Sequence, residues 1–286
     1  MGFISQVFGY LLNFLYEVFN NYGIAIIIFS ILLRIILIPL TIKQQKTMKK
    51  SAVMQGKMQE LQKKYKGNPE KLNQEMMDMY KNEKMSPFSG CFSSIIQLII
   101  ILSVFWLVSQ PLTYMKKIDK PIIEEYKAQI QQENDGKIST YPEIEIIEKK
   151  GTDNENVRIN MEFLGIDLSK VPTQSLNDWR VYVIPVLYVI TSFISIKITT
   201  NAQKKLTKKK EIIVENGEKR EPNELDSMQQ MNNTMLYMMP IMSISIAVIA
   251  PLGLALYWLV SNILMIIERL VIDKVMSAKE DIQDVK

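Results

Sequence analysis

The chain has 286 residues, of which 48% are hydrophobic and 22% are charged, and its formal net charge is +4. Long apolar runs alternate with lysine-rich runs, which is typical of a membrane protein and not of one soluble core. The absence of histidine excludes Ser-His-Asp and Cys-His catalysis, and the single cysteine, Cys91, excludes a disulfide within the chain. Phosphate-binding and nucleotide-binding loop motifs are also missing. We therefore expect no catalytic residue, no metal site and no cofactor.

Residues 1–22 carry apolar side chains at helical spacing, interrupted by polar ones. A cleavable signal peptide would need a basic start and a small-residue cleavage site, and neither is present. We predict an amphipathic helix that lies on the outer membrane surface.

Five segments are long and apolar enough to span a bilayer, which takes about 17–25 residues in a helix. They are residues 23–42, 90–109, 181–199, 235–250 and 252–272. The predicted fold class is therefore an all-α polytopic membrane protein with five transmembrane helices.

The connecting segments have distinct compositions. The lysine-rich segment 43–88 is predicted to form a helical hairpin, in which Gly67 ends the first arm, Asn68 caps the second and Pro69 is its first residue. The acidic segment 110–178 is predicted to be a small mixed module, with a helix near 121–133 and a strand over the alternating residues 143–146.

The distribution of lysine predicts the orientation. Segments 43–88 and 200–234 are rich in lysine, whereas residues 1–22 have neither lysine nor arginine. The positive-inside rule therefore places 43–88, 200–234 and the tail 273–286 in the cytoplasm, and the N-terminus and segment 110–178 outside.

Arg34 lies near the middle of the first apolar segment, 23–42, which contains no carboxylate. An arginine at bilayer depth costs about 3 kcal/mol on insertion scales and far more in simulations of an isolated helix. Its side chain leans towards the N-terminus of its helix, away from the water at the Lys43 end. We expect an unpaired guanidinium that faces a water-containing cavity inside the protein.

Four other spans place a polar side chain at a similar depth, roughly 10–15 Å from the cytoplasmic end at about 1.5 Å per residue. These residues are Gln97, Thr191, Ser243 and Asn262. One interpretation is a shared hydrated groove that is open to the cytoplasm. The alternative is that Ser and Thr bond backbone carbonyls and that Gln97 and Asn262 bond neighbouring helices.

Glu268 is the only acid in the five spans, close to the inner end and to Lys197 and Arg269. We interpret these three charged residues as snorkelling side chains or inter-helix pairs. The groove then keeps its positive charge for an incoming anionic or polar peptide.

Several separated motifs resemble the YidC-type membrane protein insertases, a family that includes the mitochondrial oxidase-assembly and chloroplast Albino insertases. The motifs are Asn21-Tyr22-Gly23-Ile24-Ala25-Ile26, Leu33-Arg34, Ile38-Pro39-Leu40, Ser86-Pro87-Phe88-Ser89-Gly90-Cys91, Phe163-Leu164-Gly165-Ile166-Asp167-Leu168-Ser169, Met239-Pro240, and Pro251-Leu252-Gly253-Leu254-Ala255-Leu256-Tyr257-Trp258 with Ser261-Asn262.

This resemblance implies a multi-pass protein of the bacterial plasma membrane that inserts client membrane proteins and helps them fold. It implies a groove in the inner leaflet, in which Arg34 assists insertion and to which we assign Trp258. The implied partners are nascent membrane protein clients and membrane lipid, with the ribosome and the Sec translocon as further candidates, and no nucleic-acid sequence is recognised.

Three other hypotheses remain open at this point. A small-anion transporter or channel would use Arg34 as its binding charge, but it predicts paired repeats, and we find none. An intramembrane enzyme lacks histidine and paired catalytic acids. A passive assembly scaffold would give Arg34 a purely structural role.

Overall fold

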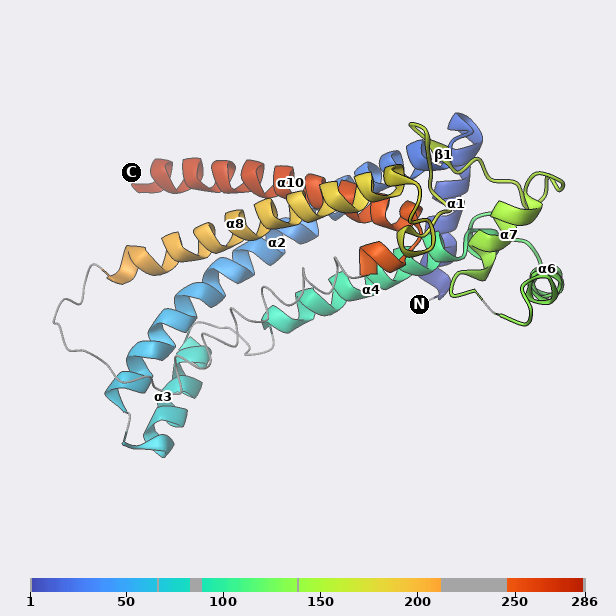
Figure 1. Ribbon diagram of the computed structural model, residues 1–286. Coiled ribbons are helices and arrows are strands. Elements are labelled where there is room, and N and C mark those ends of the chain that lie inside the picture. The colour runs from blue at the N-terminus through green and yellow to red at the C-terminus, as the bar shows by residue number, and fades with distance from the viewer. Residues whose placement is uncertain (1, 66, 83–88, 138, 212–245, 285–286) are drawn as a thin grey trace. The chain divides into compact units, whose positions relative to one another are not determined.

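The computed structural model of the protein describes residues 2–65, 67–82, 89–137, 139–211 and 246–284. Figure 1 shows the chain as a ribbon. The chain divides into two compact units. The first unit comprises residues 1–36, 98–193 and 241–286, and the second comprises residues 37–97 and 194–240. Each unit is described by itself below.

The described part of the chain is mostly helical. Its helices are α1 (Gly2–Phe19), α2 (Tyr22–Lys64), α3 (Pro69–Asn82), α4 (Ser89–Ser109), α5 (Pro111–Tyr114), α6 (Lys120–Glu133), α7 (Pro142–Lys150), α8 (Val183–Glu211) and α10 (Leu252–Asp284). Residues 246–249 are also helical. Strands β1 (Glu162–Phe163) and β2 (Ile166–Asp167) form one antiparallel pair, in which Glu162 faces Asp167 and Phe163 faces Ile166.

Three of the described helices are long and apolar enough to cross a bilayer. Their spanning parts are Tyr22–Thr47, Trp179–Asn201 and Leu252–Ile272, and a shorter apolar helix covers Ile95–Ser109. Most of the predicted span 235–250 lies outside the described residues, as does most of 200–234. A helical fold of membrane type is therefore confirmed, whereas the total of five spans stays a prediction.

The prediction of a strand over residues 143–146 is wrong, because these residues belong to α7. Pro142 occupies the first turn, where its missing N–H costs no helical bond. Acidic residues in the first turn and lysines in the last turn match the helix dipole. Ile144 and Ile147 are buried and lie one turn apart, which is the spacing expected of the buried face of a helix. The helix predicted near 121–133 is confirmed as α6.

Helix α1 packs closely against α5. A side chain at Gly9 would overlap the backbone carbonyl of Tyr114, so glycine is required for this approach. The hydroxyl of Ser5 donates to the carbonyl of Ser103 at 3.0 Å, and Leu12 is fully buried. The opposite face of α1 is exposed and carries the apolar side chains of Phe3, Val7, Tyr10, Phe14 and Val18, with the polar Gln6 and Glu17 among them. The predicted helix is confirmed, and its position on the membrane surface stays a prediction.

Backbone hydrogen bonds join three distant segments at one end of the first unit. The backbone amide of Tyr22 donates to the carbonyl of Asn160 at 3.0 Å, and the backbone amide of Gly253 donates to the carbonyl of Leu168 at 2.9 Å. Figure 1 shows α1, α6 and α7 gathered with β1 at this end, which we call the loop end. The loop end thus ties the starts of α2 and α10 to the segment around the β-hairpin.

A buried carboxylate fixes α7 to α5. Glu143 is 3% exposed and accepts hydrogen bonds from the backbone amide of Thr113 at 3.0 Å and from its hydroxyl at 2.5 Å. Burial raises the pKa of Glu143, against the opposing effect of these hydrogen bonds. The carboxylate satisfies an amide that the short α5 leaves without a helical partner.

In the second unit, α2 and α3 are joined by a short turn. The side-chain oxygen of Asn68 accepts a hydrogen bond from the backbone amide of Lys71 at 3.1 Å, which confirms the predicted cap, and Pro69 is the first residue of α3. The hydroxyl of Tyr65 donates to Glu75 at 3.1 Å. The cytoplasmic hairpin over 43–88 stays a prediction.

The close approach of α1 and α5 leads to a stability test. Gly9→Ala should destabilise the protein by about 1–3 kcal/mol, because the added methyl group overlaps a backbone carbonyl that cannot rotate away. Thermal unfolding of the purified protein in detergent would measure the change. Gly56→Ala is the matched control, since a side chain there meets open space within a helix. Equal unfolding midpoints for the two variants would contradict the packing described for α1.

Candidate functional site

Arg34 projects from α2 towards α10 within the first unit. Its Nη1 lies 3.4 Å from Oε2 of Glu268, and its Nη2 donates to the backbone carbonyl of Ser261 at 3.3 Å. The side chain of Arg34 is 18% exposed and that of Glu268 is 10% exposed. The guanidinium is therefore neither fully solvated nor sealed away from solvent.

The prediction that Arg34 lacks a carboxylate partner is wrong. Its physical premise holds, because an arginine in an apolar helix needs compensation, and the one acid in the predicted spans supplies it. Ser261 and Glu268 are seven residues apart, so they lie on the same face of α10. Glu268 is the only acid in the predicted spans, so it was the one candidate partner for Arg34 that the sequence offered.

Asn262, the next residue along α10, contacts α8. It is 7% exposed, and its side-chain amide lies 3.1 Å from the hydroxyl of Thr191 and 3.2 Å from that of Ser192. The hydroxyl of Thr191 donates to the carbonyl of Tyr188 at 3.0 Å. These contacts support the alternative interpretation, in which Asn262 bonds a neighbouring helix and Thr191 bonds a backbone carbonyl.

The remaining predicted groove residues have different surroundings. Trp258 is partly exposed, and its ring centroid lies 6.2 Å from that of Tyr188. Gln97 is partly exposed and belongs to the second unit. Ser243 lies outside the described residues. The structure thus brings Arg34, Thr191, Trp258 and Asn262 into one unit around α10. It adds Ser192, which the sequence analysis missed, and Glu268, which the sequence analysis interpreted as an inter-helix pair but did not pair with Arg34.

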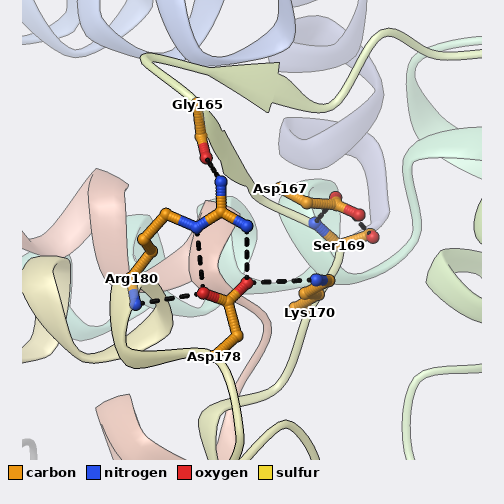
Figure 2. A network of polar contacts seen from close by, with 6 residues as sticks. All are labelled: Gly165, Asp167, Ser169, Lys170, Asp178 and Arg180. Atoms are coloured by element: carbon orange, nitrogen blue, oxygen red, sulfur yellow. Dashed lines mark hydrogen bonds and ion pairs between the residues drawn. The ribbon is translucent and has the colours of Figure 1, made fainter.

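A second polar cluster lies at the loop end, as Figure 2 shows. The guanidinium of Arg180 binds Asp178 at 2.9 and 3.3 Å and donates to the carbonyl of Gly165 at 3.1 Å. The amine of Lys170 lies 3.2 Å from the same aspartate, and Asp167 accepts from the amide and hydroxyl of Ser169. These residues line a cavity of about 370 Å³.

The charges in this cluster mostly pair with one another. The Arg180 guanidinium lowers the pKa of Asp178 to about 2, and Lys170 adds to the effect. The network therefore joins the loop after β2 to the residues that precede α8. Because its charges neutralise one another, it is a poor binding site for a charged ligand. Within the described ranges, no group of three cysteine or acidic side chains could hold a metal ion.

The apolar helices, with a partly buried ion pair between two of them, define the class of the protein as a polytopic helical membrane protein. Its sequence matches the family described as 60Kd inner membrane protein over residues 14–280. The chain belongs to this family.

Among its relatives, the membrane protein insertase YidC of Caldanaerobacter subterraneus subsp. tengcongensis is 41% identical over 108 residues, 38% of this chain and 52% of the relative. The protein of the same name from Buchnera aphidicola subsp. Baizongia pistaciae is 40% identical over 108 residues, 38% of this chain and 20% of the relative. That from Treponema denticola is 27% identical over 273 residues, 96% of this chain and 38% of the relative. The chain thus spans about half of these curated relatives' length, or less.

The Asp178 network predicts how stability responds to acid. Because the pKa of Asp178 is lowered in the folded protein, its contribution to stability is present above the usual value of about 3.9 and is lost as the pH falls through about 2. The unfolding midpoint of the wild type should therefore fall more steeply between about pH 4 and pH 2 than that of Asp178→Asn.

Thermal unfolding in detergent across this pH range measures the effect. Asp153→Asn, which changes an exposed aspartate elsewhere in the same module, serves as control and should retain the wild-type pH dependence. Parallel pH profiles for the wild type and Asp178→Asn would show that the network contributes nothing.

Proposed function

We propose that this chain is a membrane protein insertase and chaperone, which moves the polar segment of a client into the bilayer while the client's apolar segment enters lipid. The observation that carries the proposal is Arg34: a partly exposed guanidinium in a spanning helix of a protein whose family relatives are named membrane protein insertases. The lysine-rich segment 43–88 supports an orientation with that segment in the cytoplasm and the N-terminus outside.

In the proposed mechanism, Arg34 attracts acidic residues of the client's polar segment from the cytoplasmic side. A fixed positive charge at low dielectric attracts a carboxylate more strongly than the same charge would in water. The apolar segment of the client leaves water at the same time, and its burial, worth about 25 cal/mol per Å², drives the step. Nucleotide hydrolysis by this chain is not needed.

The proposed groove is centred on α10. Thr191 and Trp258 are partly exposed, which supports their assignment to its lining. Asn262 is buried, so we propose that it holds α10 against α8 beside the groove. Gln97 and Ser243 are assigned to the groove from the sequence alone.

The packing of the loop end supports a groove that is closed on that side. Tyr22, Leu252 and Leu254 are fully buried there, and backbone hydrogen bonds join the segments around them. A transporter or channel for small anions needs a route through this end. Anion flux through proteoliposomes that contain the purified protein would favour that alternative, and client insertion without flux would favour the insertase.

Replacing the arginine tests the mechanism. Arg34→Ala should lower the insertion of clients with acidic outer segments by about tenfold or more, because hydrogen bonds to charged groups contribute about 1.5–3 kcal/mol. Arg34→Lys keeps the charge and should retain much of the activity. Insertion is measured by protease protection of the client's outer segment in cells depleted of their own insertase.

The comparison requires equal amounts of each variant in the membrane, since removing one partner of a buried ion pair also destabilises a protein. A client without acidic residues in its outer segment provides the control, and its insertion should respond less to Arg34→Ala. Unimpaired insertion of the acidic client by Arg34→Ala at equal protein level would contradict a functional role of the arginine.

A further inference from the structure

From the contact between α2 and α10 we propose that Glu268 is an internal competitor for Arg34: its carboxylate occupies the guanidinium when no client is present, and the acidic group of a client displaces it. This inference rests on the proposed insertase function. Glu268 is thereby a specificity-determining residue, because it sets how acidic a client must be to engage the groove.

The geometry of the pair is that of an exchangeable contact. Charge-assisted hydrogen bonds between nitrogen and oxygen are usually about 2.7–2.9 Å long. Two lysine–glutamate pairs of this protein reach 2.7 Å, whereas Arg34 and Glu268 remain 3.4 Å apart. The Arg34–Glu268 contact is therefore looser than these pairs, and a carboxylate at the usual distance would bind the guanidinium more closely than Glu268 does.

Both partners keep unused hydrogen-bonding capacity. A guanidinium has five N–H donors. Within the described part of the chain, Arg34 makes two hydrogen bonds, at 3.3 Å to the carbonyl of Ser261 and at 3.4 Å to the carboxylate of Glu268. The second oxygen of Glu268, Oε1, is buried and has no hydrogen-bond partner among the same residues. A buried carboxylate oxygen without a partner is costly, so this arrangement does not maximise stability.

Competition between an internal and an external carboxylate has a clear consequence. An acid on the same chain acts at a high effective concentration, so it lowers the apparent affinity of Arg34 for a client acid. A client with several acidic residues overcomes this competition more easily than a client with one. Removing the internal acid should therefore benefit the weakly acidic client most.

Glu268→Gln removes the charge and keeps the shape of the side chain. For a client with a single aspartate in its outer segment, we expect the initial rate of insertion to rise by about fivefold or more, the lower end of ordinary coupling between linked sites. The rate for an otherwise identical client with asparagine at that position should not change. Both rates are measured by protease protection in proteoliposomes that contain full-length protein.

A second variant separates competition from structural support. Arg34→Ala leaves the Glu268 carboxylate in the groove, where it repels an acidic client. Adding Glu268→Gln to Arg34→Ala should therefore restore part of the lost insertion. A merely structural glutamate predicts recovery of the amount of folded protein alone, so insertion is compared at equal protein level, where a structural role gives no recovery of the rate. Glu155→Gln, which neutralises an exposed acid at the loop end, is the matched control and should behave as the wild type.

The outcomes separate the two proposals. If the wild type inserts the aspartate client and Glu268→Gln inserts it no faster at equal protein level, the competition is contradicted and the insertase function stands. If the wild type inserts neither client, the proposed function fails, and the competition fails with it.

Discussion

A guanidinium midway along an apolar helix has to be compensated, and the contact between α2 and α10 meets that requirement. Arg34 is held by the carboxylate of Glu268 and by the carbonyl of Ser261, both on α10. The next residue, Asn262, bonds the hydroxyls of α8. In lipid, apolar surface alone does not drive helices together, so such polar contacts help to set which helix faces meet. Helix α10 is the common partner of the other two candidate spans of the first unit.

The loop end is held by different means. There the amides at the starts of α2 and α10 bond the chain around the β-hairpin, and Tyr22, Leu168 and Leu252 are almost completely buried. These contacts join three of the motifs on which the family resemblance rests. Most residues of those motifs are thus explained by packing, and Arg34 stands out because its polar contacts are long and its side chain keeps some exposure.

The sequence predicted what depends on local pattern and length. Apolar runs predicted the three candidate spans, and an Asn-Pro pair predicted the cap of α3. Residues 143–146 were assigned to a strand because alternating Glu and Ile fit both periodicities over so short a stretch. The buried residues are Glu143, Ile144, Ile146 and Ile147, and this is the spacing of one helical face and not of an alternating strand.

The partner of Arg34 could not be predicted from local pattern either. Glu268 is 234 residues away, and which helix faces meet is decided by tertiary packing. The same holds for the pairing of Asn262 with Thr191 and Ser192, 71 and 70 residues away. The depth of each polar residue in its helix and the need for compensation follow from the sequence, but the direction in which each side chain points does not.

The most direct test of the account is site-specific photocrosslinking of a ribosome-bound client to two positions on α10. A photoreactive residue at Ser261 lies on the face that contacts Arg34, whereas one at Ile263, an exposed apolar position two residues on, points away from it at about 3.6 residues per turn. If Arg34 receives the client, the client's acidic polar segment crosslinks from position 261 and not from position 263. Crosslinking of that segment only from position 263, or from neither position while the client is inserted, would contradict that role of Arg34.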